Sequence, residues 1–173
     1  MTDYFALFDQ PRQAWLDPEK LKEIYHAKAR TASPDAQLNE AYQVLRDAKR
    51  RLYHLLTLRG DAPSRENAGV PREIENLFPA VAGLTRETDL LLNKLSQATN
   101  ALSRSLLKSE ITAIQNKIAG VLAIISELKN AALVRLQTVE ENDSGQLHAL
   151  YLQFSYLNRW IEQLEERQLQ LRL

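Results

Sequence analysis

The feature that most constrains the fold is a pair of long apolar seams in the second half of the sequence. Apolar residues recur at alternating spacings of four and three along residues 107–132, and of three and four along residues 147–171. This period gathers them into one stripe on a helix, and such a stripe has to be buried against partner helices. The seams are Leu107, Ile111, Ile114, Ile118, Val121, Ile125, Leu128 and Ala132, then Leu147, Leu150, Phe154, Leu157, Ile161, Leu164, Gln168 and Leu171.

A weaker apolar series precedes the two seams, and it completes the pattern of an antiparallel three-helix bundle. Residues 142–145, Asn-Asp-Ser-Gly, read as a tight turn that makes the last two helices antiparallel neighbours. Pro79 and Gly83 are expected to break or kink the helix between residues 72 and 84. The weaker series is Leu84, Leu91, Leu95, Ala98 and Leu102.

The N-terminal part carries the start signals of four short helices. Asp3 is a cap for the first, and Asp17-Pro18-Glu19 gives the second a cap, a first-position proline and an acid in its first turn. No window alternates with a period of two, so we predict an all-α fold with two lobes. The fourth helix is expected to begin at Asp47 with Leu52, Leu55, Leu56 and Leu58 inside and Lys49, Arg50 and Arg51 outside.

A segment rich in Gly and Pro separates these two patterns. Residues 60–71 contain two Gly, two Pro and few apolar residues, which is typical of a linker or surface loop. The predicted domains are therefore residues 1–60 and 72–173, with a linker over residues 61–71.

Composition argues against several function classes. Lys plus Arg and Asp plus Glu balance at 22 each, without the basic bias of a nucleic-acid binder. The absence of cysteine leaves no disulfide, thiolate metal site or cysteine nucleophile, and it fits a reducing, cytoplasmic location. No stretch approaches the ~20 apolar residues of a membrane span.

The sequence contains no recognisable catalytic or metal-binding motif. His26, His54 and His148 fall on three separate helical segments, and none has a ligand partner four residues away. No phosphate-binding loop or nucleophile elbow is present. We therefore expect no enzyme activity, no metal and no cofactor.

A tripeptide between two amphipathic segments points to a family. Ser33-Pro34-Asp35 stands where a J-domain carries His-Pro-Asp, the element that drives ATP hydrolysis on a DnaK-type chaperone. Together with residues 3–8, 39–46, 51–60 and 155–166, it resembles the HscB co-chaperones of iron–sulfur cluster assembly. The resemblance implies a J-domain over residues 1–60 and a C-terminal helical bundle that binds a scaffold protein.

The resemblance also implies candidate contact residues. The residues that would contact a DnaK- or HscA-type chaperone, as a relic of the J-domain contact, are Ser33, Pro34, Asp35, Lys20 and Lys28. For the protein partner they are Leu77, Phe78 and Tyr156, although residues 76–81 do not reproduce the family's apolar and acidic run. The loop is also short, since Asp35 and Asn39 are four residues apart.

Each of these features has a plainer interpretation. Ser33-Pro34-Asp35 is also an ordinary helix entry with Asp35 as the cap. Acids interleave with Lys20 and Lys28, as on any solvated helix face. Tyr156 neighbours Leu157 on the seam, so burial in the bundle is an equal alternative.

Two function classes follow. The first is an HscB-like co-chaperone-related protein that binds a scaffold or client protein and has lost ATPase stimulation. The second is a helical interaction or assembly module that kept the fold and changed its partner. An exposed patch of Leu77, Phe78 and Tyr156 would favour partner binding. The sequence leaves the oligomeric state open, a homo-oligomer included.

We predict that the protein does not accelerate ATP hydrolysis by a DnaK-type chaperone. Ser33→His alone should not restore acceleration, because the shortened loop also sets the geometry of the tripeptide. Single-turnover hydrolysis with wild type, the variant and an intact J-domain as positive control measures this. A many-fold acceleration by the wild type would contradict the prediction.

Overall fold

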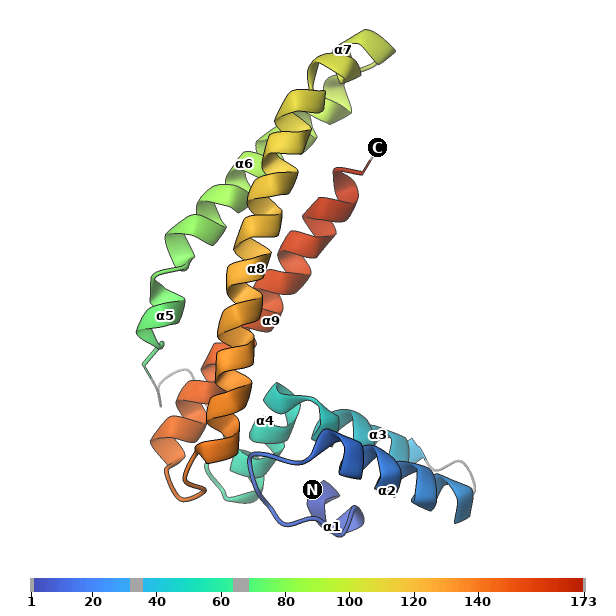
Figure 1. The fold of residues 1–173 in the computed structure, drawn as a ribbon, viewed down its shortest axis with the longest axis vertical. Coiled ribbons are helices and arrows are strands. Elements are labelled where there is room, and N and C mark those ends of the chain that lie inside the picture. Colours follow the sequence, from blue (N-terminus) through green and yellow to red (C-terminus); the bar gives the residue numbers. More distant parts are fainter. Residues whose placement is uncertain (1, 32–35, 64–68, 173) are drawn as a thin grey trace. The chain divides into compact units, whose positions relative to one another are not determined.

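A computed structural model describes residues 2–31, 36–63 and 69–172. Within these ranges the chain forms nine helices and no strand, which confirms the predicted all-α fold class (Figure 1). The helices are α1 (Tyr4–Leu7), α2 (Pro18–Thr31), α3 (Ala36–Arg46), α4 (Ala48–Leu58), α5 (Arg72–Glu75), α6 (Phe78–Gln97), α7 (Ala101–Leu106), α8 (Lys108–Thr138) and α9 (Ser144–Gln170).

The chain packs into two compact units, in agreement with the two predicted lobes. The first unit comprises residues 1–69 and 131–154, and the second comprises residues 70–130 and 155–173. Each unit has its own cluster of buried apolar side chains. The domain boundaries expected at residues 60 and 72 stay a prediction, because compactness alone does not show which segments fold independently.

Aspartates begin three of the N-terminal helices, as the sequence predicted. Their carboxylates accept hydrogen bonds from backbone N–H groups of the first turn, which stabilises a helix by about 0.5–2 kcal/mol. Asp35, the expected cap of α3, lies outside the described residues. The observed caps are Asp3 to the N–H groups of Phe5 and Ala6 (3.0 and 3.2 Å), Asp17 to those of Glu19 and Lys20 (2.9 and 3.3 Å), and Asp47 to that of Arg50 (2.8 Å).

The core of the first unit joins the N-terminal helices to the end of a helical hairpin. Helix α3 packs against α1, α2 and α4. The last turns of α8 and the first turns of α9 supply further buried residues to the same cluster. From the N-terminal helices the cluster includes Phe5, Phe8, Leu21, Leu45, Leu52, Leu55 and Leu56, and from the hairpin Ala132, Leu136, Leu147, Leu150 and Phe154.

Arg51 departs from the prediction that it faces solvent. Its side chain is only 5% exposed. The guanidinium Nε donates to the carbonyl of Ala14 at 2.7 Å, and Nη1 donates to the carbonyl of Leu45 at 2.5 Å. Burial lowers the pKa of Arg51 to about 10, so it stays charged at neutral pH. The carbonyl of Leu45 lies in the last turn of α3, where the helix dipole favours a cation.

Glu141, in the turn between α8 and α9, connects three segments of the first unit. One carboxylate oxygen accepts the N–H of Ala14 at 2.8 Å. The other pairs with Nη2 of Arg59 at 2.9 Å, and Nη1 of Arg59 donates to the backbone carbonyl of Glu141. The hairpin end is thus joined to the loop before α2 and to the end of α4 by polar contacts as well as apolar ones.

In the second unit α6, α8 and α9 lie side by side as a three-helix bundle (Figure 1). Its core confirms the predicted seams, with Leu84, Leu91 and Leu95 facing Ile111, Ile114, Ile118, Ile125, Leu157 and Leu164.

Two details of this bundle differ from the prediction. Leu102 is 73% exposed, because α6 ends at Gln97 and Leu102 belongs to the separate helix α7. The expected break lies between α5 and α6, with Pro79 in the first turn of α6, while Gly83 sits within that helix.

Ile118 and Ile125 are both fully buried at the middle of the α8 seam. We predict that replacing either with Ala lowers the free energy of unfolding by about 2–5 kcal/mol, because each change removes buried methyl and methylene groups and leaves a cavity. Glu165→Ala and Gln137→Ala, at exposed positions, should change it by less than ~0.5 kcal/mol. Urea denaturation followed by circular dichroism measures both. Equal effects at buried and exposed positions would refute the assigned core.

His54 makes the first unit sensitive to acid. Its ring is 5% exposed, and Nε2 accepts the backbone N–H of Tyr4 at 3.1 Å. Burial lowers its pKa below the ordinary value of 6.5. As the pH falls from 6.5, the unfolded chain therefore binds a proton that the folded chain refuses, and stability is lost.

We predict that wild type loses more stability between pH 7.5 and about pH 5.5 than the variant His54→Gln, whose amide keeps an acceptor and does not titrate. His26 and His148 are present in both proteins, so the difference isolates His54. Urea midpoints across this pH range give the result. Parallel pH profiles would mean that His54 is not the sensitive group.

Candidate partner-binding groove

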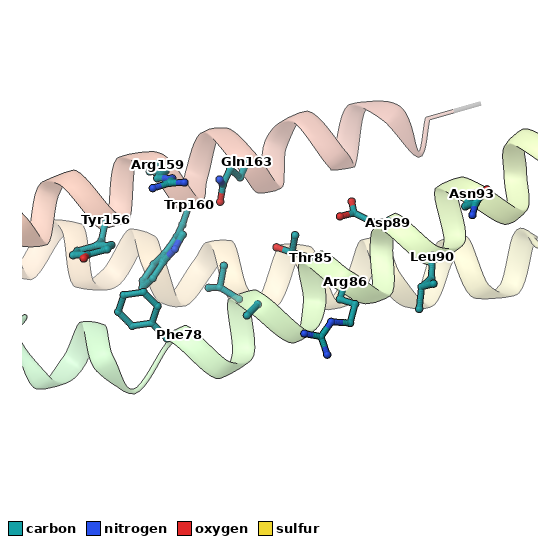
Figure 2. A pocket seen from close by; sticks show the side chains of 12 residues that line it. Phe78, Thr85, Arg86, Asp89, Leu90, Asn93, Tyr156, Arg159, Trp160 and Gln163 are labelled. Carbon is teal, nitrogen blue, oxygen red and sulfur yellow. The ribbon is translucent and has the colours of Figure 1, made fainter.

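Three aromatic side chains from α6 and α9 meet in the second unit (Figure 2). The ring centroid of Phe78 lies 5.1 Å from that of Tyr156 and 5.1 Å from that of Trp160, both edge-on. Tyr156 and Trp160 are 5.8 Å apart. Such edge contacts are favourable and hold aromatic rings in fixed orientations. Phe78 is 38% exposed and Tyr156 is half-buried, whereas Trp160 is buried. We call these three residues the aromatic cluster.

The aromatic cluster forms one end of a groove between α6 and α9 (Figure 2). The groove has a volume of about 710 Å³. Leu90, towards the other end, is 61% exposed and extends the apolar surface. The remaining lining residues are Val81, Ala82, Thr85, Arg86, Asp89 and Asn93 from α6, and Arg159 and Gln163 from α9.

The groove carries uncompensated positive charge. Asp89 is the acid among its lining residues, and Arg167 already pairs with it through two contacts, Nε to Oδ1 at 2.9 Å and Nη2 to Oδ2 at 3.2 Å. Arg86 and Arg159 make no ion pair with any residue in the described part of the chain. Figure 2 shows Arg86 on α6 and Arg159 on α9, so cations stand on both sides of the groove.

Two of the three partner-binding candidates named from the sequence line this groove. Phe78 and Tyr156 are in direct ring contact there. Leu77 is not among the lining residues; it is half-buried against the core of the second unit. The binding role of the candidates stays a prediction.

Sequence reasoning missed Trp160, Arg159 and Arg86. A signal for the first two was present, because positions three and four residues after Tyr156 share its face of a helix. Arg86 gave no comparable signal, since an arginine on an amphipathic helix reads as solvated surface.

The expected chaperone-contact residues are described only in part. Ser33, Pro34 and Asp35 lie outside the described residues. Lys20 is exposed on α2, and Lys28, on the same helix, pairs its Nζ with Asp9 at 2.7 Å. A chaperone contact through this helix stays a prediction.

In residues 2–31, 36–63 and 69–172, no three His, Asp or Glu side chains stand together as metal ligands. None of the described helices combines the length and the apolar character required to cross a bilayer.

The fold and the groove define an all-α protein with a helical bundle that bears a cationic, aromatic groove. No family model matches the sequence. Among solved structures, the chain is similar to the chaperone HscB from Vibrio cholerae, with 20% identity, a TM-score of 0.49, and coverage of 95% of this chain and 96% of that chain.

Proposed function

We propose that this chain is an HscB-like, co-chaperone-related protein that captures a protein partner in the groove between α6 and α9. The observation that carries the proposal is the aromatic cluster in a groove that Arg86 and Arg159 also line. Tyr, Trp and Arg are the residues that most often dominate the binding energy of protein interfaces. Here Tyr156 is partly exposed beside the buried Trp160, and Arg86 and Arg159 line the same groove.

The co-chaperone part of the proposal is supported by the sequence. Residues 3–8, 39–46 and 51–60 resemble the J-domain of the HscB family, and residues 155–166, which include Tyr156, resemble its last helix. Ser33 in place of the catalytic His supports loss of ATPase stimulation. The partner is then a scaffold or client protein of iron–sulfur cluster assembly in the cytoplasm.

A binding role without catalysis fits the chemistry of the groove. Among the described residues that line the groove, Asp89 is the one carboxylate, and Arg167 pairs with it. A catalytic cleft needs convergent groups poised to exchange protons or attack a substrate. We accordingly propose a protein that is neither an enzyme nor a cofactor carrier.

One observation favours the second candidate, an interaction module with a different partner. Residues 76–81 depart from the run with which the family meets its scaffold. The groove instead offers Arg86 and Arg159, which form no ion pair with any described residue. A surface of this charge selects an acidic partner segment.

We predict that Phe78→Ala and Tyr156→Ala each weaken partner capture about tenfold or more, as expected for interface anchors. Both rings are partly exposed, so the melting temperature should stay near that of wild type. Leu102→Ala is the matched control, because Leu102 is an exposed apolar residue of the same unit that does not line the groove. The readout is capture from an extract of the protein's own host, with mass spectrometry of the bound proteins.

The identity of the captured protein separates the two candidates. If wild type captures an iron–sulfur scaffold protein and neither Phe78→Ala nor Tyr156→Ala does, the co-chaperone-like function is supported. If wild type captures another specific partner in this way, the interaction module is supported. If Tyr156→Ala instead lowers the melting temperature, Tyr156 belongs to the core, and its proposed binding role is wrong.

A further inference from the structure

The first unit contains a second pocket, which we call the tyrosine pocket. It has a volume of about 280 Å³, and helices α1, α3, α4 and α9 all contribute to it. It takes no part in the capture proposed above, because none of its residues belongs to the groove. Its lining consists of Tyr4, Val44, Lys49, Arg50, Tyr53, His54 and Tyr151.

Aromatic rings make most of the pocket wall. Tyr53 is 47% exposed, and its ring centroid lies 6.0 Å from that of Tyr151. Tyr4 stacks on His54 with centroids 4.6 Å apart, so this side of the wall is held by ring packing. A surface of this kind accepts one apolar or aromatic side chain.

The pocket also carries two positive charges, those of Lys49 and Arg50. Lys49 and Arg50 lie in the first turn of α4, where the positive end of the helix dipole disfavours a cation. The next residue, Arg51, is accounted for by its buried hydrogen bonds to backbone carbonyls. Lys49 and Arg50 form no ion pair with a described residue, and no carboxylate lines the pocket.

Three acids, Asp3, Glu40 and Asp47, stand beside the pocket without lining it. Asp47 caps α4 and accepts the backbone N–H of Arg50 at 2.8 Å. Burial, the negative charge of Glu40 and the hydrogen bond that the Tyr4 hydroxyl makes with Glu40 raise the pKa of Tyr4, so this hydroxyl already has an acceptor within the fold.

We propose that the tyrosine pocket binds an acidic peptide segment of a protein partner. Carboxylates of the segment pair with Lys49 and Arg50, and one apolar or aromatic side chain packs against Tyr53 and Tyr151. A nucleic acid fits less well, since such binding draws on many phosphate contacts and the chain has a formal net charge of +0 with two cations here. Charge complementarity thus selects the peptide.

The test is a chemical-shift titration of the full-length ¹⁵N-labelled protein with the unlabelled peptide acetyl-Glu-Asp-Phe-Asp-Glu-amide. The backbone signals of residues 49–54 should shift saturably. The neutral analogue acetyl-Gln-Asn-Phe-Asn-Gln-amide should bind at least about tenfold more weakly, because it forms no charge-assisted hydrogen bonds.

Charge-reversal variants locate the site. Lys49→Glu with Arg50→Glu should weaken binding of the acidic peptide at least about tenfold and leave the melting temperature unchanged or higher, because acids suit the first turn of a helix. Lys20→Glu with Lys22→Glu, two exposed positions on α2, changes the net charge equally and should leave the affinity within about twofold. Tyr53→Ala should also weaken binding.

Four outcomes would overturn the proposal. They are equal weakening by the two double variants, equal binding of the two peptides, shifts confined to residues outside the pocket, and tighter binding of a single-stranded oligonucleotide than of the acidic peptide. None of them bears on the groove between α6 and α9, whose aromatic variants are tested separately.

Discussion

Both cores depend on the same two apolar seams, because α8 and α9 supply buried residues to each unit. Ile118 and Ile125 of α8 lie in the core of the second unit, whereas Ala132 and Leu136 of the same helix lie in that of the first. Along α9 the change falls between Phe154 and the residues that follow it. The continuous period of the seams therefore serves two different sets of neighbours, and sequence periodicity alone does not distinguish them.

The sequence predicts the features that depend on residues close to one another along the chain. Asp3, Asp17 and Asp47 begin helices because a carboxylate reaches N–H groups two or three residues away. Arg51 could not be placed this way. Its burial depends on the carbonyls of Ala14 and Leu45, which only the tertiary fold brings to it, and its neighbours in sequence gave it the appearance of a surface cation.

The groove shows the same limit. Tyr156 could be named from the resemblance and Trp160 from helical spacing, but the charge of the groove depends on Arg167 pairing with Asp89 from another helix. Once that pair is formed, Arg86 and Arg159 are left as the groove's unpaired charges among the described residues. The chain has a formal net charge of +0, yet the fold places positive charges together in the groove.

The contacts of Glu141 with Ala14 and Arg59 can form only late in folding. The contact with Arg59 spans 82 positions of sequence, and the core around Phe5 includes Phe154. Contacts of such separation form slowly, because a long loop has to close first. During synthesis the N-terminal helices leave the ribosome before their hairpin partners exist, so apolar surface stays uncovered until α9 has emerged.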